Sequence, residues 1–357
     1  MATMQQSGSA EEAPLSRLSG RHRFRLVIIT LSVIAAVTGA AILFTTSGSK
    51  QATTQSVAVT LRVPGAPNAI VAGPDVLWAA LNIGNGTSGG RLVRLNLATG
   101  AIERTLRIKG FLGGSAIRLG DSIWIESNPD ATDTQPGAVL KVNSRSGAIA
   151  ARIPFDRPVF GMAAGDGALW VIVGRAPATI VRIDPASGIA GRPVRIDSNR
   201  VIGLAFGDGA LWATAYENGM LVRIDPNNSS LRRINVGTDP VGVAVAQGSV
   251  WVALRADGSL VRVEAKTMRI AGNPIHTGGL STWVAAVAGS VWVSNQADGT
   301  VVRVNAKTGA TIGAPIRIAP ASTTGTPPAA HALSVTANSL WVASMSQQTV
   351  SRIDPSR

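Results

Sequence analysis

Residues 207–226 read Gly-Asp-Gly-Ala-Leu-Trp-Ala-Thr-Ala-Tyr-Glu-Asn-Gly-Met-Leu-Val-Arg-Ile-Asp-Pro. A Gly-rich turn at 207–209 leads into a short apolar segment that carries Trp212, and a further turn leads to the apolar segment 221–225. Gly and Asp-Gly favour tight hairpin turns, and Asp-Pro favours the start of a turn. The stretch therefore predicts two antiparallel strands, with further short strands before and after them.

The same pattern recurs along the chain and marks an internal repeat. Seven of the eight tryptophans follow an aliphatic residue and begin a short apolar segment, at intervals of 46, 46, 42, 39, 41 and 49 residues. This period is typical of the four-stranded blade of a β-propeller. The repeat tryptophans are Trp78, Trp124, Trp170, Trp212, Trp251, Trp292 and Trp341. The sequence thus predicts an all-β, seven-bladed propeller of antiparallel blades over residues 56–357.

The arrangement of the strands predicts how the ring closes. Each unit is a meander with two apolar faces, and radial packing of sheet on sheet buries both. Each tryptophan is expected to fill the space between neighbouring blades. The last unit ends after its third strand, whereas Val57–Val63 resembles an isolated fourth strand. We expect Val57–Val63 to complete the sheet that contains Trp341.

The first 55 residues predict a membrane anchor. Residues 26–44 contain no charge and are long enough, at about 1.5 Å per residue, to cross the hydrocarbon core as one helix. Basic residues concentrate in the preceding segment 1–25, which the positive-inside rule places in the cytoplasm. A polar linker, 45–55, would lead to an extracytoplasmic propeller. The alternative is a signal peptide cleaved near Thr38-Gly39-Ala40.

Composition narrows the classes of function. The chain has a net charge of +13, but its basic residues are dispersed and only 4% of its residues are aromatic, which argues against a nucleic-acid surface. It has no cysteine, so disulfides and thiolate metal sites are excluded. No phosphate-binding loop, nucleophile elbow or paired-histidine zinc motif is present. We predict no catalytic residue, metal or cofactor.

The strings Asp-Gly-Ala-Leu-Trp and Val-Arg-Ile-Asp-Pro resemble the repeats of the streptogramin lyase (virginiamycin B lyase) type of seven-bladed propeller. They are also similar to YVTN and NHL-like repeats of bacterial surface proteins. The lyase resemblance implies chemistry with a His base, a Glu and Mg²⁺, the Glu lying three residues after the tryptophan. No repeat here has Glu at that position, and Glu126 comes one residue early. Only His276 and His331 lie in the propeller region.

A basic residue recurs on every third strand, and its recurrence indicates a role in the scaffold. An acid or amide follows two residues later, on the same face of the strand. Each basic side chain is expected to pack against the tryptophan of the preceding strand; the alternative is a ring of cations that binds an anionic polymer. These basic residues are Arg94, Lys141, Arg182, Arg223, Arg262, Arg303 and Arg352.

Departures from the repeat indicate where a site lies. Nine residues before each tryptophan the chain has Ala, Ser or Gly, except in unit six, where it has Trp283. Trp283 is either a stacking platform at the channel mouth or a plug of the channel. His331 lies at the channel rim, and the long loops of units one, two and seven should cluster beside it. The candidate ligand-binding residues are Trp283, His331, Asn82, Asn85, Asp130, Asp133 and Thr324.

These features predict a membrane-anchored, extracytoplasmic propeller that binds a protein, glycan or small molecule as a scaffold or sensor module. The alternative is a lyase-like or lactonase-like enzyme that uses the central channel.

Overall fold

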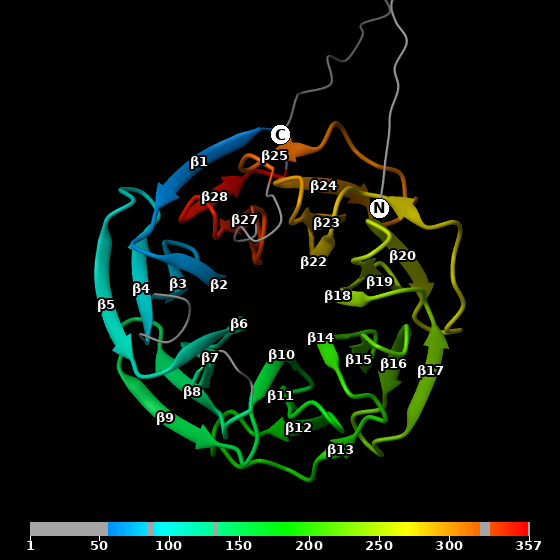
Figure 1. Cartoon of the computed structure of the whole chain (residues 1–357), viewed down its shortest axis with the longest axis horizontal. Helices are drawn as coiled ribbons and strands as arrows, with labels where there is room; N and C mark the ends of the chain where they lie inside the picture. The colour runs from blue at the N-terminus through cyan, green and yellow to red at the C-terminus, as the bar shows by residue number, and fades with distance from the viewer. Residues whose placement is uncertain (1–55, 84–88, 131–133, 322–328, 356–357) are drawn as a thin grey trace, which may run out of the picture. The chain divides into compact units, whose positions relative to one another are not determined.

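The computed structural model describes residues 56–83, 89–130, 134–321 and 329–355. These residues form seven four-stranded antiparallel sheets arranged around a central axis (Figure 1). The predicted anchor at 26–44 and its flanking segments lie outside the described residues. Within the described part of the chain, no helix has the length and apolar character needed to cross a membrane.

Blades 1 to 6 follow one another along the chain, each with its strands in sequence order. Blade 1 contains β2 (Ala66–Ala72), β3 (Val76–Asn82), β4 (Gly90–Asn96) and β5 (Ile102–Ile108), and blade 2 contains β6 (Phe111–Leu119), β7 (Ser122–Asn128), β8 (Ala138–Asn143) and β9 (Ile149–Pro154). Blade 3 contains β10 (Val159–Gly165), β11 (Ala168–Val173), β12 (Thr179–Ile183) and β13 (Val194–Arg195), and blade 4 contains β14 (Val201–Gly207), β15 (Ala210–Ala215), β16 (Met220–Ile224) and β17 (Leu231–Asn235). Blade 5 contains β18 (Pro240–Ala246), β19 (Ser249–Leu254), β20 (Ser259–Glu264) and β21 (Ile275–His276), and blade 6 contains β22 (Ser281–Val287), β23 (Ser290–Asn295), β24 (Thr300–Asn305) and β25 (Ile316–Arg317).

Blade 7 joins the two ends of the propeller. Its order is β1 (Val57–Arg62), β28 (Thr349–Ile353), β27 (Ser339–Ser344) and β26 (Leu333–Thr336). β1 pairs antiparallel with β28, and the Thr60 and Ser351 hydroxyls hydrogen-bond at 3.0 Å. The predicted closure by residues 57–63 is confirmed, so the ring is held by strand pairing between segments almost 300 residues apart.

The repeat tryptophans lie between blades as predicted. Trp341 of blade 7 packs with Leu77 and Leu95 of blade 1, and the other six repeat tryptophans pack in the same way against the blade that follows them. Each is at most 3% exposed. Burial of seven large aromatic side chains at the blade interfaces supplies much of the apolar burial that stabilises the ring.

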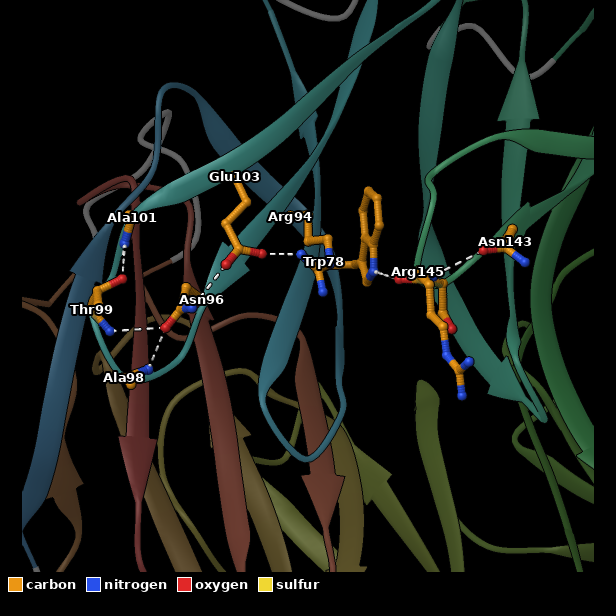
Figure 2. Close-up of polar contacts among 10 residues, drawn as sticks. Trp78, Arg94, Asn96, Ala98, Thr99, Ala101, Glu103, Asn143 and Arg145 are labelled. Atoms are coloured by element: carbon orange, nitrogen blue, oxygen red, sulfur yellow. Dashed lines mark hydrogen bonds and ion pairs between the residues drawn. The ribbon is translucent and has the colours of Figure 1, made fainter.

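The basic residue of each third strand lies directly opposite the tryptophan of its own blade, as Trp78 does with Arg94. In five blades the cation lies 5.2 to 6.0 Å from the indole ring. Figure 2 shows the arrangement in blade 1, where Arg94 pairs with Glu103 and the Trp78 indole donates to the Ser144 carbonyl of blade 2 at 3.1 Å. These contacts support the predicted scaffold role over a ring of free cations.

Candidate functional site

Trp283 lies in the bulge of β22, where the register against β23 shifts between Ser281 and Val284. Its backbone N–H donates to the Ser294 hydroxyl at 3.2 Å. A Cβ at Gly114 of blade 2 would lie 3.5 Å from the Trp283 Cζ2 atom. Blades 2 and 6 lie on opposite sides of the ring (Figure 1), so the indole extends across the channel.

His331 joins Trp283 to blade 1. Its Nδ1 atom lies 3.4 Å from the Trp283 indole nitrogen and 2.9 Å from Nε2 of Gln296, and its Nε2 atom lies 3.2 Å from Oδ1 of Asn68. An indole N–H can only donate, so Nδ1 must accept and Nε2 must carry the proton, which it donates to Asn68. Burial lowers the pKa of His331 to about 4, so the ring is neutral at physiological pH.

Two adjoining cavities open at this end of the channel. The first, the Glu126 cavity, has a volume of about 160 Å³ and is lined by Glu126, Arg175 and Arg200 together with Phe160 and small residues of blades 2 and 3. The Arg175 guanidinium lies 4.7 Å from the Phe160 ring. Glu126 is only 2% exposed, and it fits because Gly113 opposite it has no side chain: a Cβ there would overlap the carboxylate.

The second, the Arg255 cavity, has a volume of about 270 Å³ and is lined by Arg255, Gln296 and His331 with neighbouring residues of blades 4 to 6. Arg200, Ile202 and Trp283 line both cavities, so these three residues form their common wall. The Arg200 guanidinium stacks 4.8 Å from the ring of Tyr216, which is also a lining residue. The channel mouth therefore combines an aromatic face, guanidinium groups and one buried carboxylate.

The predicted site residues are only partly brought together. Trp283 and His331 are in edge-to-face contact, with ring centroids 5.8 Å apart. Asn82 lines neither cavity: its side chain bonds both the N–H and the carbonyl of Leu112, each at 2.9 Å, and so joins blade 1 to blade 2. Asp130 is partly buried beyond the end of β7 and lines neither cavity. Asn85, Asp133 and Thr324 lie outside the described residues.

Sequence reasoning missed the charged lining residues Glu126, Arg175, Arg200 and Arg255. Glu126 could have been found from the sequence, because it is charged where the other six units have Ala, Ile, Thr or Ser two residues after the tryptophan. Arg255 occupies the position four after the tryptophan, which varies from unit to unit and carries no such signal. Within the described residues, no group of three or more His, Asp or Glu side chains is placed to hold a metal ion.

Comparison with solved structures finds proteins of the same fold at low sequence identity. A virginiamycin B lyase from Staphylococcus aureus, solved as a catalytically inactive variant with quinupristin, is 16% identical and superposes with a TM-score of 0.67 over 83% of this chain and 98% of the lyase. The fold is that of a seven-bladed β-propeller. The WD40 domain of Neurospora crassa Pan2 is similar at 12% identity and a TM-score of 0.64, over 86% of this chain and 97% of that domain. A chain of the mitotic checkpoint complex is similar at 13% identity and a TM-score of 0.69, over 93% of this chain and 98% of that chain.

The sequence comparisons are less informative. A model described as a repeat of unknown function (DUF6923) matches residues 125–271, which span the repeats of blades 2 to 5. No curated protein matches the sequence. As many as 1491 chains of solved structures match the fold, so the fold by itself does not indicate a function.

Proposed function

We propose that the chain is a ligand-binding propeller whose site is the channel mouth beside Trp283. The observation that carries this proposal is that one large, partly exposed aromatic ring stands where every other unit has a small residue, and that it forms part of the common wall of two cavities. A scaffold residue would be expected to recur in the repeat, as the seven buried tryptophans do. Binding sites combine an apolar wall with a few fixed polar groups, and the channel mouth has both.

The polar groups beside Trp283 are held in place before any ligand arrives. His331 is bonded through both ring nitrogens, and Asn68 in turn donates to the Leu112 carbonyl at 3.0 Å. This chain of bonds connects blades 6, 7, 1 and 2 and fixes the orientation of the indole. A preorganised wall lowers the entropic cost of binding, which favours recognition of a rigid ring of a small molecule, a sugar or a partner side chain.

We further propose that the propeller is displayed outside the cell, on the anchor formed by residues 26–44. The support is the uncharged segment and the basic residues that precede it. Protease added to intact cells should digest the propeller and leave an N-terminal tag intact. A protected propeller would contradict this topology, and a mature N-terminus near Ala41 would show cleavage in place of anchoring.

The second candidate function is a lyase-like or lactonase-like enzyme that uses the same channel. The buried Glu126 carboxylate in the cavity favours it, as does the likeness in fold to virginiamycin B lyase. His331 is a poor base, however, because both its nitrogens are engaged and burial lowers its pKa to about 4. Incubation with streptogramins, with and without Mg²⁺, tests this candidate: linearised product that is lost in Glu126→Gln would establish an enzyme.

Binding is tested by screening a library of small ring compounds and sugars against the full-length chain, with ligands detected by thermal stabilisation. Trp283→Gly should keep the fold, because Gly occupies the equivalent position in units three, four and five. It should weaken the binding of each ligand by about tenfold or more, since an aromatic pair contributes about 0.5–1.5 kcal/mol and the apolar area lost from the contact adds to this. Ile189→Gly is the control, because it also removes a large exposed apolar side chain, one that is 69% exposed. Equal affinities in the two variants would contradict the proposed site.

A further inference from the structure

The Arg255 cavity contains two guanidinium groups and no carboxylate among its lining residues. Arg200 and Arg255 both line it, and none of its lining residues is an Asp or Glu. Among the residues that the structure describes, neither guanidinium has a hydrogen bond or an ion pair; the Arg200 side chain is held by the face of Tyr216. Their N–H groups are therefore available to a ligand.

Elsewhere in the propeller, basic side chains of comparable burial are used by the scaffold. Arg157 donates to the Pro177 carbonyl at 2.8 Å and to the Thr179 hydroxyl at 2.9 Å. Arg262 donates to the Ser249 hydroxyl at 2.9 Å and to the Lys307 carbonyl at 3.0 Å. Two like charges in one cavity repel each other and are costly to desolvate without an anion. The presence of Arg200 and Arg255 together at the channel mouth is thus better explained by binding of a ligand than by a contribution to the stability of the fold.

We propose that this site takes an anionic ligand with a planar ring, such as an aromatic carboxylate, whose acidic group bonds Arg200 and Arg255 while its ring packs on Trp283. The guanidinium fork matches the two oxygens of a carboxylate, and the same groups would accept a phosphate or sulfonate. The inference rests on the proposed function, since it specifies the ligand of the same site.

The neighbouring cavity suits an acidic group less well, because it contains a carboxylate. Glu126 is buried in its wall and Arg175 and Arg200 also line it, so an anion placed there would meet charges of both signs. The Arg255 cavity offers only cations and neutral groups, because the imidazole of His331 is uncharged at physiological pH. The acidic group therefore lies on the Arg255 side of Trp283, and the ligand's ring extends along the indole.

The test compares three probes with the same ring and shape but different charge: benzoate, benzamide and benzamidine. Their dissociation constants for the full-length chain are measured by calorimetry, at two salt concentrations. Benzoate should bind roughly tenfold or more tightly than benzamide, the gain expected for a charge-assisted hydrogen bond, and benzamidine should bind most weakly. Arg255→Gln and Arg200→Gln should each remove most of that preference.

Arg269→Gln is the matched control. It removes the same charge from blade 5 at an exposed turn that lines neither cavity, so the preference for benzoate should persist. If Arg255→Gln retains the preference, or if Arg269→Gln loses it equally, the net charge of the chain and not this site attracts the anion, and the inference is overturned. If all three probes bind equally and Trp283→Gly weakens them all, the proposed function stands and the anionic ligand is wrong. If Trp283→Gly weakens none, the site itself is wrong.

Discussion

Closure of the ring by β1 predicts that one inward-facing residue near the beginning of the propeller controls the stability of the whole domain. Leu61 is half-buried and packs with the core shared by blades 7 and 1, whereas Ala58 on the same strand is exposed. Leu61→Asp and Ala58→Asp add the same charge to the same strand, one toward the core and one toward solvent. Only the first should destabilise the propeller.

The magnitude follows from the contacts of β1. Five residues of β1 pair with β28, and a net contribution of about 1 kcal/mol per backbone bond gives ~5 kcal/mol for the strand. Partial burial of Val57 and Leu61 adds about 1 kcal/mol each. Deleting β1 should therefore remove roughly half or more of the ~5–15 kcal/mol that stabilises a domain. Leu61→Asp loses the leucine burial and also places a carboxylate against an apolar core, which should cost about 3 kcal/mol.

Urea unfolding followed by tryptophan fluorescence measures this effect, because the seven repeat tryptophans are buried between blades. With a denaturant dependence of about 3 kcal/mol per molar, Leu61→Asp should lower the midpoint by roughly 1 M. Ala58→Asp should shift it by less than ~0.2 M, as expected for an exposed substitution. Equal midpoints for both variants and the unchanged chain would refute the argument that β1 locks the ring.

Three further predictions concern side chains. Because burial holds the pKa of His331 at about 4, against an ordinary value of 6.5, the unfolded chain gains a proton first as the pH falls. The free energy of unfolding should therefore drop by up to about 3 kcal/mol between pH 6.5 and 4. In His331→Asn, urea titrations should show a free energy of unfolding that changes much less over this pH range. Asn128→Ala should cost about 2–3 kcal/mol, because it orphans the buried N–H and carbonyl of Val159, whereas the exposed Asn338→Ala should cost almost nothing in the same titrations. Arg303→Met should lower the melting temperature, because it removes the bond to the Ser290 hydroxyl and the charge 5.2 Å from Trp292.

The fold was predictable because its determinants repeat. A tryptophan and an opposing basic residue recur in all seven units, and each pair can be read from its own unit without knowledge of the others. Ring closure was also predictable, because the unit that contains Trp341 lacks a fourth strand and Val57–Val63 supplies an unmatched one. Both features follow from the repeated pattern of apolar residues, so they can be predicted from a single sequence.

The site was predictable only where it breaks the repeat. Trp283 and His331 stand out in aligned units, but the groups they meet come from other blades and depend on the bulges of the inner strands. Asn82 illustrates the limit: a polar residue at a loop was expected to face a ligand, but it bonds the backbone of the next blade. Local sequence gives no means of telling an amide that satisfies backbone groups from one that awaits a ligand.

The position of a bound ligand, determined by crystallography on the complex with the tightest compound found, would show whether the channel mouth is the binding site. We expect electron density there, with the ring against the Trp283 indole and the acidic group within hydrogen-bonding distance of Arg200 and Arg255. Density on another face of the propeller, with the side chains of Trp283 and Arg255 unchanged and the two cavities empty, would contradict it.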